Sequence, residues 1–195
     1  MNNVIRSLHE LAAFLDDIDV AYALIGGLAV SIHSEPRFTA DVDLVVAAAS
    51  DEEAEHIIFR LISRGYQTNS VVEQSKSGRL AMTRLQLGDH AVADLLFASS
   101  GVEPEIVAGA LRLEVVPDLI LPVAQIGDLI VLKLLASSKD RPQDQMDLVN
   151  LVAVANISDL ERARWIAEQI MQRGTNRGRD LLDLLSKATQ DVSQC

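Results

Sequence analysis

The sequence predicts an α+β fold in which a mixed β-sheet core, flanked by helices, is followed by an all-helical region. Apolar runs of strand length, bounded by Gly, Pro or Asp, recur up to residue 124. From residue 125 onward the apolar residues recur with helical spacing. A chain of 195 residues is long enough for such a core with a helical appendage. We therefore expect an α/β core at 1–124 and a helical C-terminal region, packed on that core, at 125–195.

The individual elements follow from the apolar spacing and from the residues that interrupt it. Ser50 precedes three acidic residues and is a plausible N-cap for the helix that they open. Gly88, Asp89 and His90 form a connection of hairpin length between two strand candidates. In chain order we expect a helix at 3–17, a strand at 20–25, a helix at 28–33, a strand at 41–47, a helix at 51–64, strands at 66–72, 79–87 and 91–98, a short helix at 103–111, a β-rich segment at 113–123, and helices at 125–138, 142–155, 158–173 and 176–190.

Composition excludes several functional classes. The net charge is −11, which argues against broad, sequence-independent DNA binding, because such binding needs basic surface. No apolar run approaches the ~20 residues of a membrane span. The only cysteine is Cys195, so an intrachain disulfide and a cysteine-based zinc site are excluded. We expect a cytoplasmic protein that does not associate with a membrane.

The most informative stretch runs from Ile25 to Val46. Gly26 and Gly27 follow an apolar run, and glycines allow backbone N–H groups to approach a ligand closely. The helix expected after them would direct its positive end toward the same place, which suits an anion such as phosphate. Asp41 and Asp43, one residue apart in a predicted strand, point to one face and repel each other unless a cation lies between them. The simpler explanation places both acids at an exposed strand end or paired with Arg37.

Asp94 is a third carboxylate in an otherwise apolar predicted strand. Three aspartates on strands would suit Mg²⁺, which prefers oxygen ligands, and a two-metal phosphoryl or nucleotidyl transfer site. Asp89 is the alternative third acid if the strand register differs from the expected one.

Polar residues in the helical region form a second candidate group. Lys133 lies in the middle of an apolar helix, where it is either a cation for phosphates or a lysine that extends to the helix margin. Asp144 and Asp147 follow Arg141 and share a helix face at i, i+3 spacing. Asp144 could also be an ordinary acid of a first helical turn.

Together these residues resemble a known family. Ile25-Gly26-Gly27 and the later Asp41-Val42-Asp43-Leu44 resemble the nucleotidyltransferase motif of the DNA polymerase β superfamily. The intervening Pro-Arg-x-Thr, together with Lys133 and the Asp144-x-x-Asp147 pair, is similar to the abortive-infection-type (AbiEii-like) nucleotidyltransferase toxins. Many superfamily members carry Ser where this chain has Gly27, although Gly-Gly is usual in the narrower family.

The resemblance implies a nucleotidyltransferase-like sheet that binds a nucleoside triphosphate (NTP) with Mg²⁺, two ions being expected and Mn²⁺ an alternative. Asp41, Asp43 and Asp94 would be the metal ligands and, with Lys133, the catalytic residues. The nucleotide-binding residues implied are Gly26, Gly27, Arg37, Thr39, Lys133, Asp144 and Asp147.

Three functions are compatible with these residues. The first is nucleotidyl transfer to RNA, in particular tRNA, by the toxin of a toxin–antitoxin pair, with an antitoxin or another regulator as partner. The second is transfer to a small molecule, such as an antibiotic, or to a protein hydroxyl. The third is a catalytically degenerate nucleotide-binding module. The three acids and Lys133 favour an active enzyme, while the acidic charge disfavours a large RNA acceptor.

Overall fold

A single seven-stranded mixed sheet forms the centre of the molecule. The computed structural model describes residues 3–89, 91–137 and 142–192, and the strand order is β3-β4-β5-β2-β1-β7-β6. β2 pairs with β5, and β1 with β7, in parallel, whereas the other neighbours are antiparallel. The strands are β1 (Tyr22–Leu24), β2 (Val42–Val46), β3 (Gln67–Glu73), β4 (Leu80–Gln86), β5 (Ala93–Leu96), β6 (Leu111–Val116) and β7 (Leu119–Val123).

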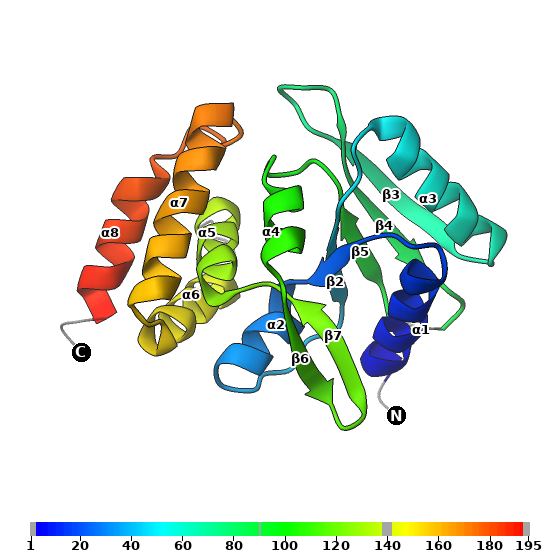
Figure 1. Cartoon of the computed structure of the whole chain (residues 1–195), viewed down its shortest axis with the longest axis horizontal. Coiled ribbons are helices and arrows are strands. Elements are labelled where there is room, and N and C mark those ends of the chain that lie inside the picture. Colours follow the sequence, from blue (N-terminus) through cyan, green and yellow to red (C-terminus); the bar gives the residue numbers. More distant parts are fainter. Residues whose placement is uncertain (1–2, 90, 138–141, 193–195) are drawn as a thin grey trace.

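Helices flank the sheet and make up the described part of the chain after β7. Figure 1 shows α5 to α8 gathered on one side of the molecule, with α1 and α3 on the opposite side. None of the described helices is both long and apolar enough to cross a membrane. The helices are α1 (Asn3–Asp17), α2 (Gly26–His33), α3 (Asp51–Ser63), α4 (Glu103–Gly109), α5 (Ile126–Ala136), α6 (Pro142–Val154), α7 (Ile157–Arg173) and α8 (Leu181–Val192).

One continuous cluster of buried apolar side chains joins the sheet to the helices after it. Leu44 in β2, Leu95 in β5 and Ile130 in α5 are fully buried members of this cluster. Burial of apolar surface is the main force that holds such layers together. The α+β class is therefore confirmed, with a mixed sheet, flanking helices and a helical C-terminal region. The division at residue 124 stays a prediction.

The predicted elements are present, and their ends differ where local hydrogen bonds intervene. β1 begins at Tyr22 rather than at residue 20, because the Val20 amide donates to the Leu15 carbonyl at 3.0 Å and completes the turn after α1. β2 begins at Val42, so Asp41 lies just before the strand and not in it. α2 begins at Gly26, two residues earlier than expected.

The largest difference concerns the last helix, which begins at Leu181 and not at residue 176. Arg177 and Gly178 both have positive φ, which interrupts a right-handed helix. The Asp183 amide then donates to Asp180 Oδ1 at 3.0 Å, so Asp180 caps the helix that follows. Ser50 caps α3 as predicted, by accepting from the Glu53 amide.

Candidate active site

Strand register brings the predicted acids together at one end of the sheet. Asp43 in β2 lies directly opposite Asp94 in the parallel strand β5, and Asp41 immediately precedes β2. Residues that are opposite each other on paired strands project to the same face. Asp89, the alternative third acid, lies in the turn before β5 with an 87% exposed side chain and pairs with Arg6 at 3.4 Å. The third carboxylate of this group is therefore Asp94.

The three carboxylates disturb one another electrostatically. Burial, followed by the negative charges of Asp94 and Asp41, raises the pKa of Asp43 from 3.8 to about 6. The positive charges of Lys133 and Arg84 oppose that rise. A pKa raised by burial and like charges indicates excess negative charge that a cation would neutralise.

Arg84 supplies a cation from within the protein. It lies in β4 opposite Asp94 in β5, and its Nε and Nη2 donate to the two Asp94 carboxylate oxygens at 2.8 and 2.6 Å. The same Nη2 is 3.9 Å from Asp41 Oδ2. Sequence reasoning placed Arg84 on a strand but gave it no role. The signal was present, because a hairpin centred on Asp89 places residues 84 and 94 opposite each other.

Gly26 and Gly27 leave room for the side chains that surround them. A Cβ atom on Gly26 would lie 1.9 Å from Asp43 Oδ2, and Gly26 also has a φ of 64°. A Cβ on Gly27 would lie 2.7 Å from Arg37 Nη2 and 2.9 Å from Thr39 Oγ1. Both distances are too short for any side chain. The first turn of α2 therefore lies directly against Asp43 on one side and Arg37 on the other.

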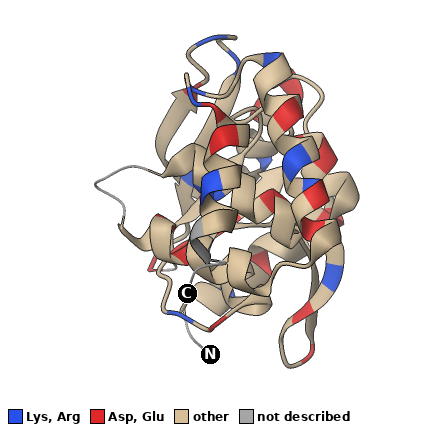
Figure 2. Ribbon diagram, turned by 90° about the vertical axis from the view of Figure 1, so that its left-hand side faces the viewer, with Lys and Arg blue, Asp and Glu red and all other residues tan. Residues whose placement is uncertain are grey.

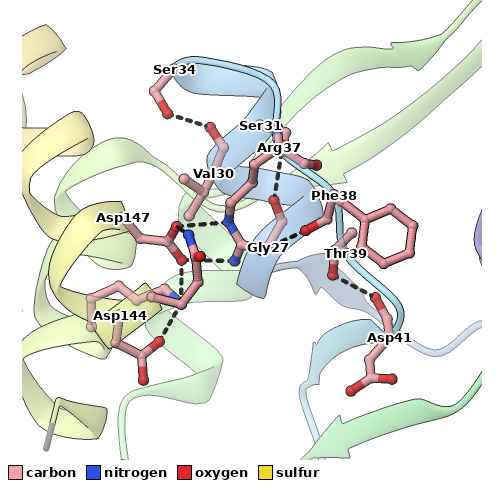
Figure 3. Close-up of polar contacts among 12 residues, drawn as sticks. Gly27, Val30, Ser31, Ser34, Arg37, Phe38, Thr39, Asp41, Asp144 and Asp147 are labelled. Carbon is pink, nitrogen blue, oxygen red and sulfur yellow. Dashed lines mark hydrogen bonds and ion pairs between the residues drawn. The ribbon is translucent and has the colours of Figure 1, made fainter. Parts of the chain in front are cut away.

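A second charged cluster lies beside these glycines (Figure 3). The Lys133 ammonium is 2.7 Å from both Asp144 Oδ1 and Asp147 Oδ2. Arg37 Nε is 2.7 Å from Asp147 Oδ1, and Arg37 Nη2 donates to Asp147 Oδ2 at 2.8 Å. Gln143 adds a further hydrogen bond to Asp147 at 3.0 Å. The Asp147 side chain is fully buried at this junction of α5, α6 and the loop after α2.

This cluster decides between several of the sequence alternatives. Arg37 pairs with Asp147 and not with Asp41 or Asp43. Lys133 is only 12% exposed and pairs with two acids, so it does not extend into solvent at a helix margin. Thr39 donates to the Asp41 carbonyl at 3.4 Å and so supports the loop before β2. Arg141 lies outside the described residues.

The donor chemistry fits a divalent cation, but the present arrangement does not yet form a metal site. Within residues 3–89, 91–137 and 142–192, no three His, Cys, Asp or Glu side chains are placed so that they could hold one ion together. Both Asp94 oxygens are instead engaged by Arg84. Carboxylate oxygens are the ligands that Mg²⁺ prefers, and the raised pKa of Asp43 shows a deficit of positive charge at this place.

Comparison with known proteins places the chain in a fold class. No protein-family model and no curated protein matches the sequence. Three solved structures resemble it over most of both chains. An antigenic nucleotidyltransferase-like protein from Paracoccidioides brasiliensis is 18% identical, with a TM-score of 0.51, over 92% of this chain and 88% of that one. The antibiotic-resistance factor ANT(2'')-Ia is 17% identical, with a TM-score of 0.50, over 96% and 91%.

The third similar structure is the lincosamide antibiotic adenylyltransferase LnuA in its lincomycin-bound form. It is 16% identical, with a TM-score of 0.50, and the match covers 79% of this chain and 100% of that one. At such low identities the likeness concerns the fold. The chain therefore has a nucleotidyltransferase fold, as the motifs predict. The narrower AbiEii-like resemblance is not confirmed by these matches and stays a prediction.

Proposed function

We propose that the protein is a Mg²⁺-dependent nucleotidyltransferase, which moves a nucleoside monophosphate from an NTP to an acceptor hydroxyl. The observation that carries this proposal is the strand register that gathers Asp41, Asp43 and Asp94 beside the first turn of α2. The nucleotidyltransferase fold supports it. A degenerate module is disfavoured, because a cluster of repelling acids is costly to retain without a cation to bind.

In the proposed reaction each charged group has a definite task. Asp41 and Asp43 would hold Mg²⁺, with Asp94 as the third ligand, and the bound cation would offset charge on the triphosphate. The acceptor oxygen forms a bond to the α-phosphorus while the bond from that phosphorus to the bridging oxygen breaks, so pyrophosphate leaves. The acceptor proton passes to a carboxylate, for which Asp94 is the candidate.

The triphosphate would lie along the first turn of α2. Gly26 and Gly27 expose backbone there, and the positive end of the helix favours an anion. Lys133 and Arg37 would provide positive charge, with Asp144 and Asp147 fixing their positions, and Thr39 would support the loop that carries Asp41. These residues form the proposed nucleotide site.

For the acceptor we favour a small hydroxyl compound over RNA. Arg37, Lys133 and Arg84 are the cations of the described site, and each one is paired with a carboxylate. On the helices facing the viewer in Figure 2, acidic and basic segments are interspersed, and the basic ones form no continuous band. An RNA acceptor needs basic docking surface. Two of the similar structures are described as an antibiotic-resistance factor and an antibiotic adenylyltransferase.

RNA, in particular tRNA, is the second candidate acceptor, with the protein acting as the toxin of a toxin–antitoxin pair. The similarity of the Pro-Arg-x-Thr and Asp144-x-x-Asp147 motifs to AbiEii-like toxins favours it. This role would bring an antitoxin or another regulator as a partner.

A labelled-nucleotide assay tests the proposal. The purified protein is incubated with Mg²⁺, each α-labelled NTP and, separately, total tRNA or a panel of aminoglycosides and lincosamides. We expect label on an acceptor and release of pyrophosphate, both abolished in Asp43→Ala. Arg79→Gln is the matched control, because Arg79 pairs with Asp51 away from the site. Absence of Mg²⁺-dependent nucleotide binding would overturn the proposal.

A further inference from the structure

Arg84 holds Asp94 in a way that a divalent ion would have to compete with. Its guanidinium donates to both carboxylate oxygens, at 2.8 and 2.6 Å. Such bidentate pairs are the strongest arginine–carboxylate contacts and use oxygen lone pairs that a metal would need. Nη2 is also 3.9 Å from Asp41, so one guanidinium bridges two of the three acids.

The two partners differ in how easily they can move. The Asp94 side chain is 11% exposed and lies in the strand β5 between β2 and β4, whereas the Arg84 side chain is 41% exposed. An arginine with this exposure can turn its guanidinium into water, because its long side chain has several rotatable bonds. The carboxylate is therefore the fixed partner of this pair and the guanidinium the displaceable one.

We propose that Arg84 is a displaceable counter-cation, which neutralises the carboxylate cluster in the metal-free protein and must release Asp94 before Asp94 can ligate a divalent ion. This inference rests on the proposed function, since it concerns metal entry into that same site. It explains why three converging acids are not yet arranged to hold an ion together among the described residues. It also makes Arg84 a positioning residue that lowers the metal affinity of the resting protein.

Metal binding without nucleotide tests this role directly. Free Mn²⁺ is measured by electron paramagnetic resonance during titration of the metal-free wild type, Arg84→Gln and Arg79→Gln. Because Arg84→Gln removes a competing positive charge, we expect its Kd for Mn²⁺ to be about tenfold lower than that of the wild type. Arg79→Gln changes a similarly exposed arginine just before the same strand, and it should bind Mn²⁺ like the wild type.

A second variant keeps the test decisive if Arg84→Gln folds poorly. Arg84→Lys retains the charge but cannot donate to both Asp94 oxygens, so its Kd should fall in the same direction by less. Added Mn²⁺ should also raise the melting temperature of Arg84→Gln more than that of the wild type. Equal or weaker Mn²⁺ binding by both variants would overturn the inference, as would a lack of binding in every protein.

The outcomes separate this inference from the proposed function. Tighter Mn²⁺ binding by Arg84→Gln, combined with no transfer by the wild type to any acceptor, would support the counter-cation and contradict the transferase. Transfer by the wild type, combined with unchanged metal affinity in Arg84→Gln and Arg84→Lys, would support the transferase alone.

Discussion

Asp43 is the residue at which function and stability oppose each other. Burial and the charges of Asp94 and Asp41 raise its pKa to about 6, from 3.8 in an ordinary aspartate. Between these values the folded protein holds a proton that the unfolded chain has released. The contribution of Asp43 therefore makes the free energy of unfolding fall as the pH rises from about 4 to about 6.

We predict that Asp43→Asn stabilises the metal-free protein at pH 7 while it abolishes transfer. The expected gain is about 2–3 kcal/mol, because the charged form of Asp43 is no longer confined beside two other acids. Urea unfolding in EDTA at several pH values measures it, and the difference between variant and wild type should shrink below pH 4. A difference that is constant with pH would contradict the assignment of the raised pKa to Asp43.

Gly26 is predicted to tolerate no side chain, and Gly78 provides its matched control. Both glycines have positive φ, so an added Cβ strains either backbone by about 1–2 kcal/mol. Only at Gly26 would the Cβ also meet Asp43, whereas nothing lies within 4 Å of the corresponding position at Gly78. Gly26→Ala should therefore lose transfer and nucleotide binding, while Gly78→Ala loses only stability. Equal activities of the two variants would show that this contact is unimportant.

At the scale of elements, Asp147 joins α6 to α5 and to the loop after α2. Although burial acts to raise the pKa of Asp147, hydrogen bonds from Arg37, Lys133 and Gln143 lower it overall. The stability contributed by this carboxylate is therefore present above its ordinary pKa and is lost as the pH falls through the lowered value. Its removal leaves two cations without their shared partner.

We predict that Asp147→Asn lowers the free energy of unfolding by about 3–5 kcal/mol at pH 7, as expected when one partner of a buried ion pair is removed. Asp144→Asn should have a smaller effect, because Asp144 is 13% exposed while Asp147 is fully buried. Chemical denaturation of both variants measures the difference. A larger loss in Asp144→Asn would contradict the central position of Asp147.

At the scale of the whole molecule, binding should require nucleotide and metal together. The chain carries a net charge of −11 and presents three carboxylates at the site, so a free triphosphate is repelled. We predict that Mg²⁺-NTP raises the melting temperature by roughly 5–10 °C at a hundredfold excess over its Kd. NTP in EDTA should give almost no shift, and Asp43→Ala should remove the shift with Mg²⁺. Thermal scans with each addition made separately test this.

The sequence carried much of this architecture because its local patterns agree with the fold. Apolar alternation predicts the strands, helical spacing predicts α5 and α7, and a lone acid in an apolar strand marks Asp94. Such signals depend only on neighbouring residues, so they survive without knowledge of distant contacts. The length of the connection between β4 and β5 even contained the pairing of Arg84 with Asp94.

Long-range contacts were decided only by the tertiary structure. Arg37 and Asp147 are far apart in the chain, and no local pattern indicates that their side chains meet at 2.7 Å. The need for glycine at residue 26 comes from the Asp43 carboxylate, which β2 places against it. The sequence by itself determined which residues carry charge and on which elements they lie. Packing decided which charges share a partner, because burial makes the location of each counter-ion a property of the whole molecule.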